Sequence, residues 1–329
     1  MRKPQATEEA TDAARADDDQ DLFGLGPPGA LPQAPRAGRA STTAHHGEIL
    51  QGAVEGEDGS LRHCLVTLRC RIFSSEAKFE PGGGAVVVTP GWKVKALRAA
   101  ELTLERYGRE GRGGRLAIRS NIPPRWGLGS STSDVTAAIR AVGDAYGLDI
   151  LAETVAGLAV EAEVASDSTM FDDRAVLFAF RGGHVIEDFG GRFPPLDVLG
   201  FNTDLTGAGV DTLSHPLARY TREEVTALRP LVEQLRRAVR AQDARLVGEV
   251  ASASARINQS HLPKRNYDYL ERLVERVGAL GLQVAHSGTI AGLLFDPRSP
   301  AVGAQVEEAR ALLSEVGIVS AWRFQTSDG

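Results

Sequence analysis

The sequence predicts an α+β protein, a mixed α/β chain with strands and helices in both halves. Short apolar stretches such as Ala175–Phe180 are typical of strands, and stretches with apolar residues at helical spacing, such as Val135–Tyr146, are typical of helices. The two kinds do not alternate in the regular way of a doubly wound sheet. Hydrophobic residues make up 42% of the 329 residues, a share that is enough for a sizeable core.

The first half has predicted strands and helices on either side of one glycine-rich loop. Partial alternation in Leu61–Phe79 predicts one or two strands, and the pieces GGGAVVVTP and RLAIRSN predict further short strands. After the loop, helical spacing continues to Tyr146, and Gly147 offers a C-terminal stop. A second helix is predicted over Leu151–Ala165, followed by strands at RAVLFAF and GHVIEDF.

The second half of the chain also contains both predicted strands and predicted helices. After a strand at VLGFNTD, helices are predicted over Arg222–Arg240, Ala244–Asn258 and Tyr267–Leu280. Strands at LQVAHS and AGLLFD follow, and a last helix over Val302–Val316 precedes a strand at VSAWRF.

The first 40 residues differ from the rest. They are rich in Ala, Asp, Pro, Gly and Arg without sustained apolar periodicity, which predicts a disordered tail over 1–40. The tail contains GLGPPG at Gly24–Gly29, but no strand precedes this piece and its prolines remove amide donors, so we reject it as a dinucleotide site. We expect two domains after the tail, over 41–190 and 191–329.

Charge and composition narrow the function classes. The net charge of −6 disfavours a nucleic-acid partner, because binding polyphosphate needs a basic face. The sequence has neither an apolar run of about 18 residues nor an apolar signal region at its start, so we expect no membrane segment and a cytoplasmic location. Cys64 and Cys70 lie in an apolar run, where buried reduced thiols are expected.

One glycine-rich loop is a candidate phosphate-binding site. In PPRWGLGSSTSD, Pro123–Asp134, two glycines and a run of hydroxyl residues precede a helix. The first amides of a helix lack intrahelical partners and favour an anion. A phosphate site and a serine-capped turn remain equal alternatives on the loop alone. No lysine follows the glycines as a Walker A loop requires.

Two further motifs accompany the loop in order, HHGEILQG at His45–Gly52 and VAHSGTIAGLLFD at Val284–Asp296. Together the three resemble the motifs of the GHMP kinases, whose loop pattern is Pro-x-x-x-Gly-Leu-Gly-Ser-Ser. The first and last motifs, with the Leu-Pro-Lys piece at Leu262–Lys264, resemble the branch of the L-threonine kinases of cobalamin side-chain synthesis. The likeness runs across most of Ser41–Phe295.

The resemblance implies an ATP-dependent kinase that uses Mg²⁺ and acts on a small hydroxyl compound. It also implies the GHMP kinase two-domain architecture, with an S5-like N-terminal domain that binds ATP and a ferredoxin-like C-terminal domain on the substrate side. The residues that it assigns to ATP binding are Pro124, Gly127, Leu128, Gly129, Ser130, Ser131 and Thr132.

The acidic segment EAEVASDSTMFDD contains the candidates for the catalytic carboxylate and the magnesium ligand. Asp167 resembles the family's catalytic aspartate, which would take or orient the proton of the substrate hydroxyl. Glu163 resembles the magnesium ligand that acts with Ser131. The spacing here is one residue longer than the family pattern leads us to expect, so Glu161 stays open as a substitute. A solvated acidic loop is the alternative. Asp172 and Asp173 are expected at the surface.

The first and last motifs contain the residues that the resemblance places next to the substrate. The residues predicted to contact the substrate are His46, Glu48, His286, Ser287, Gly288 and Thr289. For His46 a position facing solvent is the alternative, and for Glu48 a structural role. Lys264 is a candidate to compensate negative charge in the cleft. Thr42 stands where several GHMP kinases carry a lysine or arginine, so activation would depend on Asp167 and the metal, or on a cation from elsewhere.

The predicted activity is phosphorylation of an alcohol, most specifically the hydroxyl of L-threonine or a related hydroxy amino acid. A kinase for homoserine, another amino alcohol or a specialised metabolite is the enzymatic alternative. A kinase-like fold retained as an inactive binding protein is the alternative from another class. The oligomeric state, a dimer included, is left open.

Overall fold

A computed structural model describes residues 34–56, 58–109, 111–207, 209 and 217–327. Within it one mixed sheet runs through the chain, and its main path has the order β10-β7-β9-β8-β1-β2-β4-β3. Off this path, β5 pairs with β2 and with β6. The strands are β1 (Gly38–Glu55), β2 (Leu61–Gly83), β3 (Val86–Thr89), β4 (Arg112–Ser120), β5 (Arg174–Ala179), β6 (His184–Arg192), β7 (Asp197–Asn202), β8 (Gly281–Val284), β9 (Ile290–Phe295) and β10 (Ala321–Gln325).

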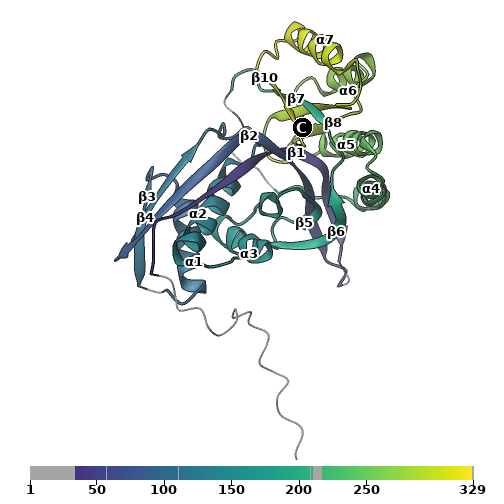
Figure 1. The fold of residues 1–329 in the computed structure, drawn as a ribbon. Coiled ribbons are helices and arrows are strands. Elements are labelled where there is room, and N and C mark those ends of the chain that lie inside the picture. The colour runs from purple at the N-terminus through teal and green to yellow at the C-terminus, as the bar shows by residue number, and fades with distance from the viewer. Residues whose placement is uncertain (1–33, 57, 110, 208, 210–216, 328–329) are drawn as a thin grey trace, which may run out of the picture. The chain divides into compact units, whose positions relative to one another are not determined.

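The helices form two groups along the chain (Figure 1). α1 (Val94–Arg106), α2 (Ser130–Tyr146) and α3 (Ala152–Glu163) pack beneath the strands of the first half. A short 3₁₀ helix, η1 (Thr169–Phe171), follows them. The helices of the second half are α4 (Arg222–Ala241), α5 (Ala244–Asn258), α6 (Tyr267–Arg276) and α7 (Val302–Glu315). None of the helices in the described part of the chain has the length and apolar character needed to cross a membrane.

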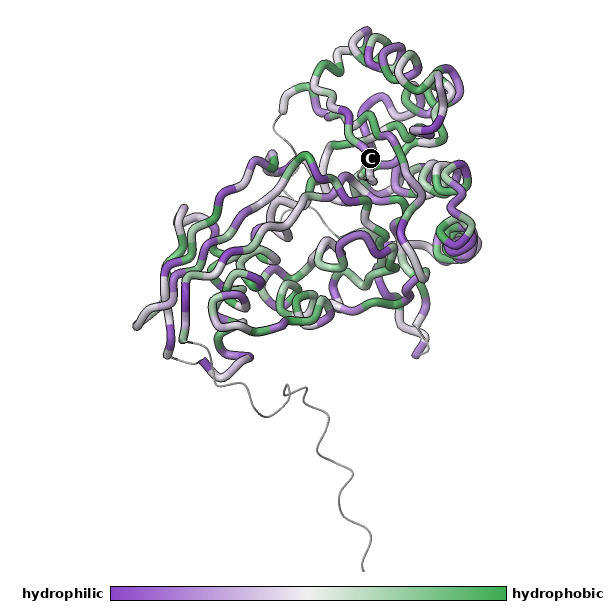
Figure 2. The backbone as a smooth tube through the Cα atoms, viewed as in Figure 1, coloured by the Kyte–Doolittle hydropathy of each residue, from purple (hydrophilic) through white to green (hydrophobic). Residues whose placement is uncertain are grey.

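The long strands β1 and β2 connect the apolar cores because their two faces are buried by different helices. Leu68 and Cys70 on β2 pack in one core with residues of α4 and α5. Leu65, on the opposite face of the same strand, packs with α2 and α3. Hydrophobic and hydrophilic stretches alternate along these strands in Figure 2. A second connection is the pairing of Glu48 with Val284, which joins β1 to β8.

Most predicted elements are present. Both cysteines are free and buried, as expected, and burial raises the pKa of each thiol to about 12. The helix α1 and the full length of β1 were not predicted from the sequence. The predicted tail boundary at residue 40 needs correction, because Gly38–Ala40 already pair with Ala77–Phe79 in β2. Residues 1–33, which hold the rejected GLGPPG piece, lie outside the described residues.

Candidate active site

The glycine-rich loop makes a tight entry into α2. Gly129 is the N-cap residue in the left-handed conformation, with φ of 69°. The first backbone bond of the helix runs from the amide of Ser133 to the carbonyl of Gly129, at 2.9 Å. The amides before Ser133 therefore point out of the helix end, where the helix dipole favours an anion.

The loop packs directly on the third predicted motif. A side chain at Gly288 would lie 2.4 Å from the Cα atom of Gly127, and the amide of Thr289 donates to the carbonyl of Trp126 at 2.9 Å. This close approach explains why glycine stands at both positions, since any Cβ would collide with backbone. The predicted phosphate loop and the His-Ser-Gly-Thr turn thus form one wall of the site.

Ser131 and Glu163 meet at the start of α2. The Ser131 hydroxyl donates to Glu163 Oε2 at 2.6 Å, and the Thr132 hydroxyl donates to Glu163 Oε1 at 2.8 Å. Burial raises the pKa of Glu163 to about 7, an effect that these two hydrogen bonds and Lys95 oppose. Glu161 is exposed on the same helix, so the geometry favours Glu163 as the carboxylate partner of Ser131.

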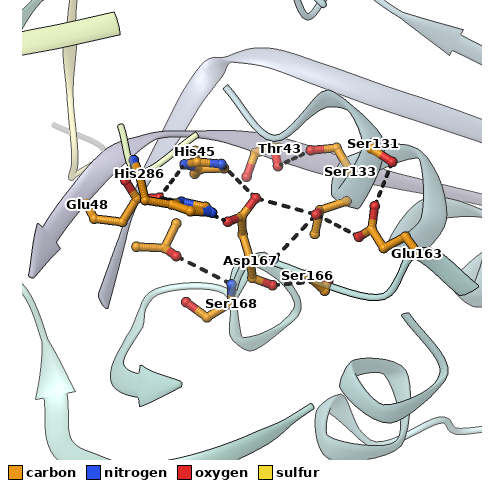
Figure 3. Close-up of polar contacts among 12 residues, drawn as sticks. Thr43, His45, Glu48, Ser131, Ser133, Glu163, Ser166, Asp167, Ser168 and His286 are labelled. Carbon is orange, nitrogen blue, oxygen red and sulfur yellow. Dashed lines mark hydrogen bonds and ion pairs between the residues drawn. The ribbon is translucent and has the colours of Figure 1, made fainter. Parts of the chain in front are cut away.

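Asp167 lies at the centre of the polar cluster in Figure 3. Its Oδ2 atom is 2.8 Å from His45 Nε2 and 3.4 Å from the Thr132 hydroxyl. Its Oδ1 atom is 3.8 Å from His286 Nδ1. Burial alone would raise the pKa of Asp167, but the charge and hydrogen bond of His45 lower it well below the ordinary value. Asp167 is therefore ionised at neutral pH.

A second carboxylate, Glu48, completes the cluster from β1. Its Oε1 atom is 2.8 Å from His286 Nδ1 and 3.7 Å from His45 Nδ1, and its Oε2 accepts the His286 amide at 2.8 Å. Burial lowers the pKa of His45, but Asp167 and Glu48 more than offset this and raise it to about 9. Burial also lowers the pKa of His286, but the charge and hydrogen bond of Glu48 raise it above its ordinary value. Two histidines and two buried carboxylates thus lie side by side in this cluster.

Two groups of donors near this cluster have the chemistry of cation sites. Ser131 and Glu163 offer the hard oxygen ligands that Mg²⁺ prefers, at the helix end where phosphate would lie. Donor atoms of His45, Glu48 and Asp167 also lie within 4.8 Å of one another. In that second set, His45 already makes a direct ion pair with Asp167.

The structure brings together some of the predicted residues and not others. Glu48, Gly127, Ser131, Glu163, Asp167 and His286 lie around one region. His46 points the other way. Its Nδ1 atom contacts the Gln283 amide and its ring packs on Trp322 and Phe324. His46 is fully buried against these residues, so it does not face solvent.

The other predicted residues differ in their burial and contacts. Leu128 is buried in the core below the loop, while Pro124 is exposed at the loop's outer end. Ser130 is half-buried beside Ser131. The carbonyl of Thr289 accepts hydrogen bonds from Thr203, and the carbonyl of Ser287 packs against Gly127. Asp172 is exposed, whereas Asp173 is half-buried and paired with Arg69 and Arg71.

Three residues that contribute charge stand out in the structure. His45, which the prediction passed over in favour of His46, contacts Asp167. Lys95 on α1 places its Nζ atom 3.8 Å from Glu163 Oε2. Lys264 is buried, its Nζ atom donates to the carbonyl of Leu262 at 3.1 Å, and burial lowers its pKa to about 7 although Glu48 raises it. Only Lys264 had been singled out from the sequence.

Comparison with known proteins identifies the fold. Residues 94–182 match the model of the GHMP kinases' N-terminal domain. The homoserine kinase from Cytophaga hutchinsonii superposes with a TM-score of 0.66 at 13% identity, covering 91% of this chain and 96% of that chain. This is the GHMP kinase fold. A further structure with that fold, MDDEF in complex with MVAPP, AMPPCP and magnesium, has a TM-score of 0.59 at 14% identity over 88% of this chain and 97% of that chain.

Within the GHMP kinase fold, the sequence is similar to two L-threonine kinases. The L-threonine kinase of Citrobacter freundii is 32% identical over 183 residues, which make up 55% of this chain. The match covers 62% of the length of that enzyme, less than two thirds.

Proposed function

We propose that the chain is an ATP-dependent kinase that transfers the γ-phosphoryl group to the hydroxyl of L-threonine or a related hydroxy amino acid. The observation that carries the proposal is Asp167, a buried and ionised carboxylate close to the free amides of a glycine-capped helix. Such an arrangement suits phosphoryl transfer, because the reaction depends on holding phosphate charge and an acceptor hydroxyl in line. The similarity to an L-threonine kinase supports the choice of acceptor.

The helix end has suitable groups for the nucleotide. The first amides of α2 would hold phosphate oxygens, and Lys95 would add a positive charge beside them. Ser131 and Glu163 would hold Mg²⁺, which neutralises phosphate charge when bound. The fold neighbour solved with AMPPCP and magnesium supports both cofactors.

The acceptor side would be formed by the first and third motifs. Asp167 would take the proton of the acceptor hydroxyl, and the Glu48–His286 pair would bound the pocket. Lys264 is buried near Glu48 and has few partners for its ammonium group, which suits it to the carboxylate of an amino acid. A cytoplasmic location and a two-domain division at 190 remain our predictions.

An ADP-release assay against hydroxy amino acids and amino alcohols, with and without Mg²⁺, tests the proposal. We expect Mg²⁺-dependent turnover with the highest kcat/KM for L-threonine. A preference for homoserine or another amino alcohol would keep the reaction but change the acceptor. Absence of turnover with every acceptor, despite ATP binding, would favour an inactive binding protein.

A further inference from the structure

The two oxygens of the Asp167 carboxylate have different surroundings. Oδ2 is engaged, since His45 Nε2 lies 2.8 Å away and the Thr132 hydroxyl 3.4 Å away. Oδ1 lies 3.8 Å from His286 Nδ1, which is beyond hydrogen-bond distance. A carboxylate held through one oxygen presents the other in a fixed direction.

His45 is itself held firmly. Its side chain is 1% exposed, its amide donates to the carbonyl of Leu128 at 3.3 Å, and its Nδ1 atom faces Glu48 Oε1 at 3.7 Å. The ring also fills the space above Gly129, where a Cβ atom would lie 2.2 Å from His45 Cδ2. His45 therefore joins β1, the N-terminus of α2 and Asp167 at one point (Figure 3).

We propose, on the basis of the kinase function above, that His45 is the positioning residue of the reaction. It binds Oδ2 of Asp167 so that Oδ1 faces the acceptor hydroxyl. In the transfer step the acceptor O–H bond breaks and its proton moves to Oδ1. The acceptor oxygen forms a bond to the γ-phosphorus, and the bond from that phosphorus to the departing ADP breaks.

This role also accounts for a departure in the first motif. Thr42 stands where the resemblance leads us to expect a lysine or arginine, and it is buried with a neutral side chain. His45 lies three residues further along β1 and brings the positive charge to the aspartate from a different point of the strand.

A kinetic experiment separates positioning from general stability. We compare the His45→Gln and Asp167→Asn variants, the double variant, and the matched control His184→Gln, whose histidine is exposed on β6. We expect His45→Gln to lower kcat about 100-fold or more with a KM for ATP within about threefold of wild type, and the double variant to be no slower than Asp167→Asn. A kcat within about threefold of wild type, or additive losses, would overturn the proposal.

A second experiment works without turnover, so it stays informative if the kinase assay fails. Long-range ¹H–¹⁵N spectra of the histidine rings should show a protonated Nε2 for His45 whose shift changes in Asp167→Asn, while the His184 signals stay in place. An unchanged His45 signal would contradict the pairing. Titration with Zn²⁺ or Mn²⁺ adds a further test, because stoichiometric binding that disappears in His45→Gln would make His45 a metal ligand instead.

Discussion

Asp167 illustrates at the residue scale how a carboxylate stays ionised out of contact with water. It is 7% exposed, and burial by itself would favour its protonated form. The His45 imidazole at 2.8 Å reverses this preference and lowers the pKa of Asp167. The cluster thereby keeps this buried carboxylate ionised at neutral pH, as its proposed role as proton acceptor requires.

The Asp167→Asn variant tests this acceptor. The amide has nearly the same shape but cannot take a proton, so we expect kcat to fall by about two orders of magnitude or more while the nucleotide still binds. ADP release measures the first effect and calorimetric titration with a non-hydrolysable ATP analogue the second. Turnover equal to wild type would remove Asp167 from the proton transfer.

Lys264 is a second residue whose burial works against stability. Its ammonium group has the carbonyl of Leu262 as a hydrogen-bond acceptor, and burial lowers its pKa to about 7. We expect Lys264→Met to raise the thermal unfolding midpoint by about 2 °C or more and to raise KM for the amino acid about tenfold or more. A lower midpoint with an unchanged KM would show that Lys264 is purely structural.

At the scale of single elements, the start of α2 depends on backbone conformation that glycine provides. Gly129 has φ of 69°, and its Cα faces the His45 ring with no space for a methyl group. The element is therefore fixed by two constraints at once, a left-handed N-cap and a close approach from β1.

The Gly129→Ala variant should reveal both constraints. The left-handed conformation alone costs about 1 kcal/mol for alanine, and displacement of His45 adds to this. We expect loss of activity together with a lower free energy of unfolding in urea. Gly84→Ala is the matched control, because Gly84 has φ of 81° with no atom within 4 Å of its added Cβ. Equal effects at the two sites would mean that the contact with His45 is unimportant.

The start of β1 and the residues just before it set a testable boundary for the folded chain. The amide of Arg36 donates to the carbonyl of Ala145 at 3.1 Å, the Arg36 side chain pairs with Asp144, and Gly38–Ala40 pair with β2. We expect removal of residues 1–33 to leave the unfolding midpoint and activity unchanged, and removal of 1–40 to lower the midpoint by several degrees. Identical midpoints for the two truncations would place the boundary at residue 40 after all.

On the scale of the whole molecule, the site is assembled where distant parts of the sheet meet. The pairing of Glu48 with Val284 brings the first motif to the third, although 236 positions separate them along the chain. The turn that contains Gly288 then packs against the turn that contains Gly127. Three motifs that are far apart in sequence thus become one site through a single sheet contact and one glycine contact.

The charge pairs of this site should make global stability depend on pH. The pKa of His45 is raised from 6.5 to about 9, so its contribution to folding is complete below pH 6.5 and is lost as pH rises toward 9. The pKa of Asp167 is lowered from 3.8, so its contribution is lost only at acidic pH below that value. Wild type should therefore exceed His45→Gln in free energy of unfolding at pH 6, and by much less at pH 9.

Urea unfolding of both proteins at pH 6, 7.5 and 9 measures this difference. A gap that stays constant over this range would show that His45 is neutral in the folded protein.

What the sequence determined was local. Glycines before a helical pattern predicted the entry to α2, and apolar periodicity predicted most of the helices, because both depend on neighbouring residues. The helix α1 escaped prediction since the apolar face that it buries is formed largely by alanines, Ala96, Ala99 and Ala100, which signal burial only weakly.

Tertiary structure alone decided which side chains meet. Successive residues of a strand point to opposite faces, so either His45 or His46 had to face the site. Register shifts between Thr43 and Ala44 and between His45 and Glu48 prevent the choice from being counted along the sequence. The choice of His45 over His46, and of Glu163 over Glu161, followed from the packing of β1 and α3 against α2, which no local pattern encodes.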